Sequence, residues 1–142
     1  MTQEQKHELL VALCGYLPYK AICNRFESAY ELVDIDIKRG LVYLLRDRQY
    51  VPYSITSGDE IKPYLRPMSS MTEEERLELS KLTDDKFKFY LYTTKPEIVC
   101  YEKYNYLEGL KVLDWLNAHH FDYRGLIPKG LALEAPEGMY FN

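Results

Sequence analysis

The sequence predicts an α+β protein in which a small antiparallel β-meander packs against an N-terminal and a C-terminal helix. Three observations predict this class. Apolar and charged residues alternate strictly from residue 33 to 38, which is the period of a strand with one solvated face. Leucines recur at helical spacing near the N-terminus, and a second helical pattern covers residues 106–120. We expect one domain over residues 1–142, with three to five strands centred on residues 30–56.

The overall composition indicates an ordinary soluble domain. The chain has 142 residues, of which 46% are hydrophobic and 28% are charged. A net charge of -4 gives no general attraction to phosphate backbones, so nucleic acid is not an expected partner. No apolar run approaches the ~20 residues that cross a membrane, and the first residues are too polar for a secretion signal. We therefore expect a cytoplasmic protein with no membrane partner.

Cysteine and tyrosine usage bear on the kind of surface to expect. The three cysteines have no CxxC spacing, which favours buried free thiols over disulfides or a zinc site. The 14 tyrosines are unusual for this length. They fit either half-buried sheet faces and the rim of the core, or a tyrosine-rich surface that contacts a partner. The sequence leaves both interpretations open.

The first helix has a start signal and two stop signals. Thr2 with Gln5 three residues later forms a capping-box pattern, in which each residue satisfies a backbone N–H at the helix start. Gly15 can adopt the left-handed conformation of a helix end, and Pro18 cannot continue a helix. The helix is therefore expected to end near Cys14. An apolar stripe follows its start at Leu9, Leu10, Leu13 and Leu17.

A meander is expected next. Strands over residues 21–26, 33–38, 41–45 and 50–56 are joined by connections too short for parallel crossovers, so neighbouring strands should be antiparallel. Asp34 and Asp36 lie on one solvated strand face. Acid–base catalysis by two carboxyl groups needs two different environments, so we do not expect a catalytic pair there.

The middle of the chain contains an expected strap, which is the name we give to residues 62–67. Pro63 and Pro67 lack amide hydrogens, which predicts an extended strap rather than regular sheet. Thr72 with Glu75 forms another capping-box pattern, so a peripheral helix should follow and run to about Leu82. Residues 86–92 are expected to form a strand and residues 93–96 a turn. Residues 98–101 fit either a short strand or an irregular lead into the last helix.

The last helix, over residues 106–120, is expected to organise the fold together with the tail that follows it. Asn105 and Glu108 can cap its start. One predicted face holds Tyr106, Leu110, Leu113, Leu116 and His120, and a second holds Leu107, Trp115 and Ala118. Asn105, Glu108, Val112 and His119 are left as the solvent side. The expected core of the whole chain is Leu10, Leu13, Val33, Ile35, Leu44, Leu110, Leu113, Trp115 and Leu116.

Three segments together resemble a known group of sequences. They are residues 17–19 (LPY), residues 63–72 (PYLRPMSSMT) and residues 119–134 (HHFDYRGLIPKGLALE). In this order they resemble small proteins encoded by phages, prophages and mobile elements of Bacteroides-like gut bacteria. That family has no assigned reaction, cofactor or active site, so no catalytic residue carries over. The resemblance implies a genetic setting, namely a phage-related protein made inside a bacterial host.

The tail motif, residues 119–134, contains two patterns that bear on chemistry, a pair of glycines and a pair of neighbouring histidines. Gly125 and Gly130 allow backbone turns that fold the apolar residues between them onto the last helix, and they lack the spacing of a phosphate-binding loop. His119, His120 and Asp122 could hold zinc together with a cysteine. However, neighbouring histidines on a helix point about 100° apart, which disfavours a shared ion. We predict no catalytic residue, no cofactor and no metal.

These observations favour a non-enzymatic protein that binds a host or phage protein, and interference with bacterial defence is one such task. The alternatives are a virion or assembly component, a nucleic-acid-binding protein and an enzyme of unrecognised type. The expected partner contacts are Tyr64, Leu65 and Arg66 of the strap and Met68 just after it. Proline pre-orders such an extended segment, which reduces the entropy lost on binding. Arg124 on its turn is a further candidate, since its setting suits a carboxylate partner. The competing interpretations are that Leu65 and Met68 pack beneath the strap and that Arg124 forms an internal ion pair.

Overall fold

The computed structural model describes residues 1–55, 60–82, 87–90, 97–100 and 106–140, and it confirms the α+β class. The helices are α1 (Gln3–Tyr16), α2 (Glu73–Lys81) and α3 (Tyr106–Ala118), with short 3-10 turns η1 (Leu17–Tyr19) and η2 (Met68–Ser70). The strands are β1 (Ile22–Arg25), β2 (Ser28–Asp36), β3 (Leu41–Arg46), β4 (Gln49–Ser54), β5 (Lys62–Leu65), β6 (Phe87–Tyr90), β7 (Glu97–Cys100) and β8 (Leu133–Glu134).

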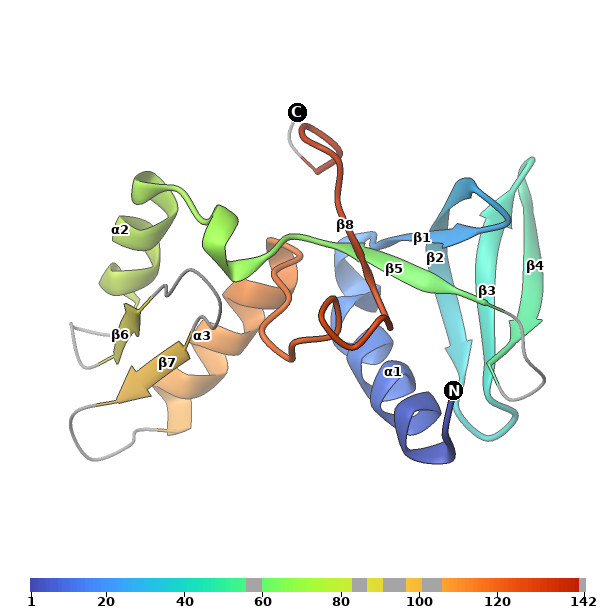
Figure 1. Ribbon diagram of the computed structural model, residues 1–142, viewed down its shortest axis with the longest axis horizontal. Coiled ribbons are helices and arrows are strands. Elements are labelled where there is room, and N and C mark those ends of the chain that lie inside the picture. Colours follow the sequence, from blue (N-terminus) through green and yellow to red (C-terminus); the bar gives the residue numbers. More distant parts are fainter. Residues whose placement is uncertain (56–59, 83–86, 91–96, 101–105, 141–142) are drawn as a thin grey trace.

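The main sheet has six strands in the order β4-β3-β2-β1-β5-β8. Strands β1 to β4 form the predicted antiparallel meander. Strand β5 pairs antiparallel with β1, and β8 adds parallel to β5. In Figure 1, α1 and the meander occupy one half of the molecule, while α2, α3 and the separate β6–β7 pair occupy the other. Strand β5 runs from the first half toward the second.

Helix α1 begins as predicted and ends later than predicted. The Thr2 hydroxyl accepts from Gln5 N at 3.0 Å, and the Gln5 side chain accepts from Thr2 N at 3.0 Å. Gly15 does not stop the helix, and Lys20 instead takes the left-handed conformation, with φ of 56°. A Cβ at Gly15 would lie 3.1 Å from Asn117 Oδ1. The glycine therefore serves the close approach of α1 and α3.

The strict alternation in β2 contains an irregularity that the sequence does not reveal. The register with β3 shifts between Leu32 and Asp34, which marks a β-bulge around Val33. Leu32 is fully buried and Ile35 packs against the same core cluster, although an odd spacing would normally place them on opposite faces. The bulge restores a common face, so Leu32 replaces the expected Val33 in the core.

The expectation that residues 62–67 lie outside regular sheet is wrong, because residues 62–65 form β5. Pro63 pairs with Cys23 of β1, whereas pairing with β8 begins only at Tyr64. Pro63 therefore has a paired residue on one side only, and its missing N–H interrupts one short ladder rather than two.

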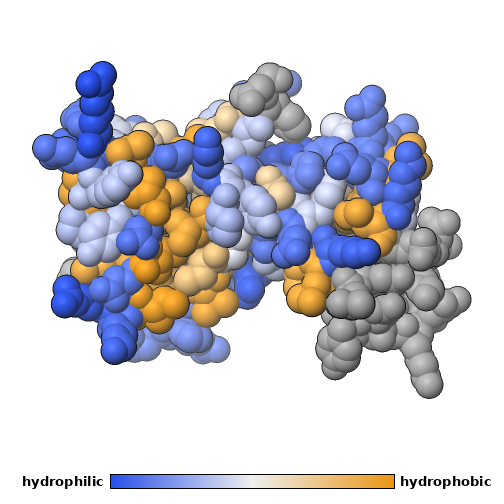
Figure 2. Space-filling view, turned by 180° about the vertical axis from the view of Figure 1, so that it is seen from behind, coloured by the Kyte–Doolittle hydropathy of each residue, from blue (hydrophilic) through white to orange (hydrophobic). Residues whose placement is uncertain are grey.

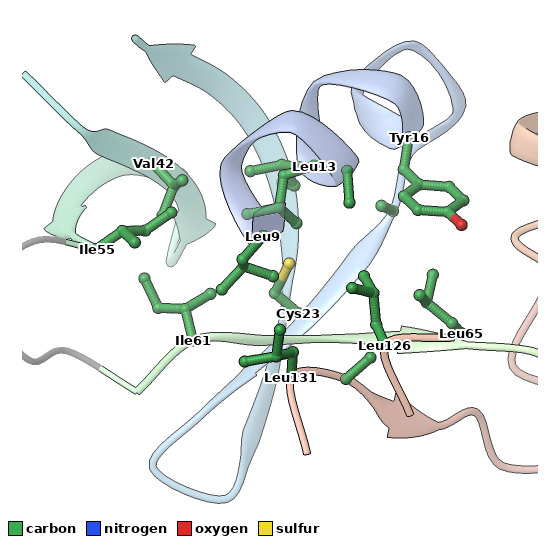
Figure 3. Packing of buried hydrophobic residues seen from close by; sticks show 14 of the residues in the cluster. Leu9, Leu13, Tyr16, Cys23, Val42, Ile55, Ile61, Leu65, Leu126 and Leu131 are labelled. Carbon is green, nitrogen blue, oxygen red and sulfur yellow. The ribbon is translucent and has the colours of Figure 1, made fainter. Parts of the chain in front are cut away.

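Two hydrophobic clusters stabilise the fold. The first joins α1 to the meander, β5 and the tail, and Figure 3 shows Leu9, Leu13 and Tyr16 of α1 pointing toward residues of these strands and of the tail. The second joins η2, α2, α3 and Phe121. Tyr123 packs against both clusters. The Tyr16 hydroxyl also donates to the Phe121 carbonyl at 2.5 Å, which links the clusters directly.

The predicted orientation of α3 is wrong. Leu116 and Trp115 are buried as expected, but Leu110 is 56% exposed and Leu113 is 38% exposed. Val112, which was expected to face solvent, is 3% exposed. Apolar residues occupy most sides of this helix. Val112, Trp115 and Leu116 therefore form an alternative apolar face at spacings of three and four, and this face is the one that is buried. Asn105 lies outside the described residues, as does the Glu108 side chain.

The remaining elements largely follow the sequence. The Thr72 capping box with Glu75 starts α2, and Leu79 of this helix is fully buried. Strands β6 and β7 pair antiparallel. This confirms the strand expected within residues 86–92 and decides between the two alternatives left open for residues 98–101 in favour of a strand, Glu97–Cys100. The turn expected at residues 93–96 lies outside the described residues. Among the described cysteines, Cys14 and Cys23 are free thiols, and burial raises the pKa of Cys23 to about 12.

Candidate functional site

The strap does not present the apolar surface that was expected to contact a partner. Leu65 is 0% exposed and Met68 is 4% exposed, and they belong to the first and second hydrophobic clusters respectively. Arg66 is also buried, at 7%. The expected exposure of these three residues is therefore wrong, and the competing interpretation, that Leu65 and Met68 pack beneath the chain, is confirmed.

Arg66 forms a buried ion pair instead of an exposed contact. Its guanidinium donates to both carboxylate oxygens of Glu75, at 2.7 Å and 2.8 Å, and lies over the Phe121 ring at 4.1 Å. Glu75 also accepts from Thr72 N at the start of α2. Desolvation opposes ionisation of this carboxyl group, but the hydrogen bonds from Arg66 and Thr72 outweigh it and lower the pKa of Glu75. The pair holds α2 against the chain after β5.

Tyr64 and Arg124 have separate surroundings. The Tyr64 hydroxyl accepts from Asn24 Nδ2 at 3.0 Å on the neighbouring strand β1. Arg124 is exposed, and its guanidinium lies 5.5 Å from the centre of the Tyr123 ring. The structure thus does not bring the five expected contact residues onto one surface.

The tail motif folds as a packing element, as its glycines indicated, but the apolar residues between them pack against α1 and the main sheet rather than onto α3 as expected. Gly125 and Gly130 have φ of 72° and 75°. The Asp122 carboxylate accepts from the backbone N–H groups of Leu126 and Ile127 at 2.8 Å and 2.9 Å, which fixes the turn. Leu126, Leu131 and Ala132 are buried in the first cluster.

The two neighbouring histidines make separate contacts. The His119 ring stacks on Trp115 at 4.0 Å. His120 Nε2 lies 2.7 Å from the Tyr19 carbonyl, and its ring stacks on Tyr140 at 3.7 Å. Burial lowers the pKa of His120. Within the described part of the chain, no group of three or more His, Cys, Asp or Glu residues is placed to hold a metal ion.

The described tyrosines mainly serve the rim of the core. Tyr16 and Tyr140 donate to backbone carbonyls, and Tyr123 donates to Asn117 Oδ1 at 2.9 Å. Tyr50 stands apart, since it is 70% exposed. These contacts favour the structural interpretation of most tyrosines.

The most unusual surface lies at one end of the meander, and we call it the hairpin tip, defined by Arg25, Phe26 and Arg46 together with the ring of the buried Tyr53, which these side chains reach. Phe26 is 80% exposed at the turn between β1 and β2. The Arg25 guanidinium lies 3.8 Å from the centre of the Phe26 ring and 4.0 Å from that of Tyr53. A side-chain hydrogen bond to Tyr53 raises the pKa of Arg46. Two cations therefore surround one exposed ring, Phe26, and one buried ring, Tyr53.

The backbone of the hairpin tip is strained. The pairing of Arg25 with Ser28 leaves a two-residue turn, in which Phe26 and Glu27 have φ of 49° and 61°. Such turns favour Asn and Gly, and a bulky side chain at positive φ is uncommon because it clashes with the backbone. A strained position that also exposes a large apolar ring points to a role outside the folded core.

Sequence inspection missed this site because its members are spread over three strands. The available signal was an aromatic residue beside an arginine in a turn without asparagine or glycine.

Viewed from behind, the side of the molecule that holds the meander also shows hydrophobic surface between charged groups (Figure 2).

Comparisons with known proteins add no relative. No family model matches the chain, and neither a curated protein nor a solved structure matches it. Among the described residues, no helix combines the length and apolar character needed to cross a membrane.

Proposed function

We propose that this chain is a phage-related accessory protein that acts by binding a protein of the bacterial host or of the phage, through the hairpin tip. The resemblance of its three sequence segments to phage and prophage proteins supports the setting. Interference with a bacterial defence system is one task that fits such a protein, and it fits the expected location in the host cytoplasm.

The observation that carries the binding proposal is the exposed Phe26 ring on a strained turn. Aromatic and arginine side chains are enriched where protein interfaces gain most of their energy. The Arg25 guanidinium stacked on Phe26 restricts the ring before a partner arrives, which reduces the entropy lost on binding. Arg46 places a second positive charge near the same cluster.

The experiment is affinity purification of the tagged protein from phage-infected host cells, with identification of co-purifying proteins by mass spectrometry. Phe26→Asn should lose the partner while keeping the fold, because asparagine tolerates positive φ. Relief of the strain offsets the lost cation–π contact, so stability should change by less than about 1 kcal/mol. Glu27→Gly relieves the neighbouring residue, retains the ring and should keep the partner.

A control at a distance is Leu77→Ser, which removes an apolar side chain that is 57% exposed on α2. It should leave the partner bound. A partner retained by Phe26→Asn would overturn the role of the hairpin tip. Co-purification with phage particles would favour the virion or assembly alternative. Recovery of the protein alone, with turnover of a metabolite in the same extract, would overturn the binding function itself.

A further inference from the structure

A second surface lies at the opposite end of the meander. A groove of about 400 Å³ separates the first turns of α1 from the turn between β2 and β3. Its lining includes Lys6 and His7 of α1 and Lys38 and Arg39 of the turn, with Leu10 and Ile37 as apolar neighbours. The turn that holds Phe26 and the strand end that holds Arg46 lie at the other ends of these strands, so the exposed ring and the groove are distinct surfaces.

The charge of the described groove lining is opposite to that of the chain. The whole protein carries a net charge of -4, yet the described residues that line the groove include three cations and no carboxylate. Asp36 lies beside it, 3.7 Å from Arg39 Nε, and both side chains are solvent-accessible. The Asp36 carboxylate offsets one of the three positive charges, however weak the ion pair is, so the described side chains at the groove still carry a net positive charge. Lys6 lies more than thirty residues before Lys38 and Arg39 in sequence and meets them only through the fold.

The groove also has an apolar component. Ile55 is 2% exposed at its base, whereas Ile37 is 67% exposed at its edge. An exposed branched aliphatic side chain next to two cations suits a ligand that carries carboxylates and an aliphatic group close together. Among the described residues, none that lines the groove is aromatic, so this part of the lining offers no stacking platform of the kind that usually holds the bases of a single-stranded nucleic acid.

We propose that this groove binds an acidic segment of a protein partner, with aliphatic side chains among its carboxylates. Lys38 and Arg39 contact the carboxylates, and Ile37 packs against an aliphatic side chain of the segment. The inference rests on the protein-binding function proposed above and names the chemistry of a second contact. Two contacts at opposite ends of the meander would let one partner span the strands.

The test uses fluorescence anisotropy with the full-length protein and a fluorescein-labelled decapeptide of alternating glutamate and leucine. The wild type should bind this peptide, and binding should weaken as salt concentration rises. A decapeptide of alternating lysine and leucine should not bind. Lys38→Glu combined with Arg39→Glu should weaken binding by about tenfold or more. Ile37→Ser should weaken binding several-fold while leaving its salt dependence unchanged.

The matched control is Arg76→Glu combined with Lys81→Glu on α2, where both side chains are exposed. It changes the net charge equally and should leave peptide binding within about twofold of wild type. An equal loss in the control would overturn the inference, as would failure of the wild type to bind the acidic peptide. Tighter binding of a single-stranded oligonucleotide than of the peptide would also overturn it. Partner capture that depends on Phe26 would survive any of these results, so the two proposals can fail separately.

Discussion

Replacing Glu75 by alanine is expected to be among the most destabilising single changes in the described part of the chain. Glu75 accepts both hydrogen bonds of the Arg66 guanidinium and one from Thr72 N. The side chains of the ion pair are only 8% and 11% exposed. Glu75→Ala therefore leaves the buried Arg66 guanidinium without its carboxylate partner, and it also removes a capping hydrogen bond at the start of α2.

The expected loss follows from these contacts. Removing one partner of a buried ion pair costs about 3 to 5 kcal/mol, because a charge is left buried without its counter-ion. Loss of the capping interaction adds about 1 kcal/mol. Glu74→Ala is the matched control, since Glu74 is exposed in the same helical turn and should cost only about 0.3 to 1 kcal/mol through the helix dipole.

The measurement is equilibrium urea unfolding, followed by the fluorescence of Trp115. This residue is the single tryptophan and belongs to the cluster that α2 helps to form. Glu75→Leu combined with Arg66→Met should recover most of the loss, because an apolar pair of similar volume can replace a buried ion pair. A loss for Glu75→Ala no larger than for Glu74→Ala would refute the reasoning, as would a double variant no more stable than the single one.

Three further predictions concern α3 and the tail. Leu116→Ala should cost ~2 to 5 kcal/mol in urea unfolding through the cavity it leaves, whereas Leu113→Ala should cost less than ~1 kcal/mol because that side chain is partly exposed; equal losses would contradict the orientation of α3. Burial lowers the pKa of His120 below its ordinary 6.5, so the unfolded chain binds more protons and stability should fall as pH decreases through that value. Thermal unfolding should show a smaller acid loss for His120→Asn, and an unchanged loss would contradict this assignment. The Tyr140 hydroxyl accepts from Ile22 N at 3.0 Å, so Tyr140→Phe should cost ~1 to 3 kcal/mol, and a urea midpoint equal to that of the wild type would count against it.

The parts of the fold that the sequence predicted are those with local signals. The capping boxes at Thr2 and Thr72 each involve residues three apart, so they can be recognised without knowing the tertiary structure. The alternation in β2 and the short connections after it likewise predicted the meander.

The features that escaped prediction depend on residues far apart in the chain. The parallel pairing of Tyr64 with Leu133 has no local signature, and it turned an expected strap into a strand inside the sheet. The sequence does not indicate that Arg66 pairs with Glu75, whose carboxylate lies 2.7 Å from the guanidinium in the folded chain. Val112 faces inward because α2 and Phe121 cover that side of α3, and helical periodicity alone could not choose between two apolar faces.

The candidate surfaces were hidden for the same reason. The turn after β1 has neither asparagine nor glycine at its two positions, so the sequence places Phe26 in a strand over residues 21–26 and predicts neither the turn nor its exposed ring. Lys6 is far from Lys38 and Arg39 in sequence, and only the packing of α1 beside the β2–β3 turn brings the three cations together.

The tail that follows α3 sets the order of events during synthesis. Phe121 completes the second cluster, while Leu126 and Leu131 belong to the first, and β8 borders β5. Ribosomes add about 5 to 20 residues per second, so the meander emerges seconds before the residues that cover it. During that interval Leu65 and Tyr16 lack their neighbours from the tail. Folding of both halves must therefore finish after translation has passed residue 132, and a ribosome stalled in the tail would hold a chain with two incomplete cores.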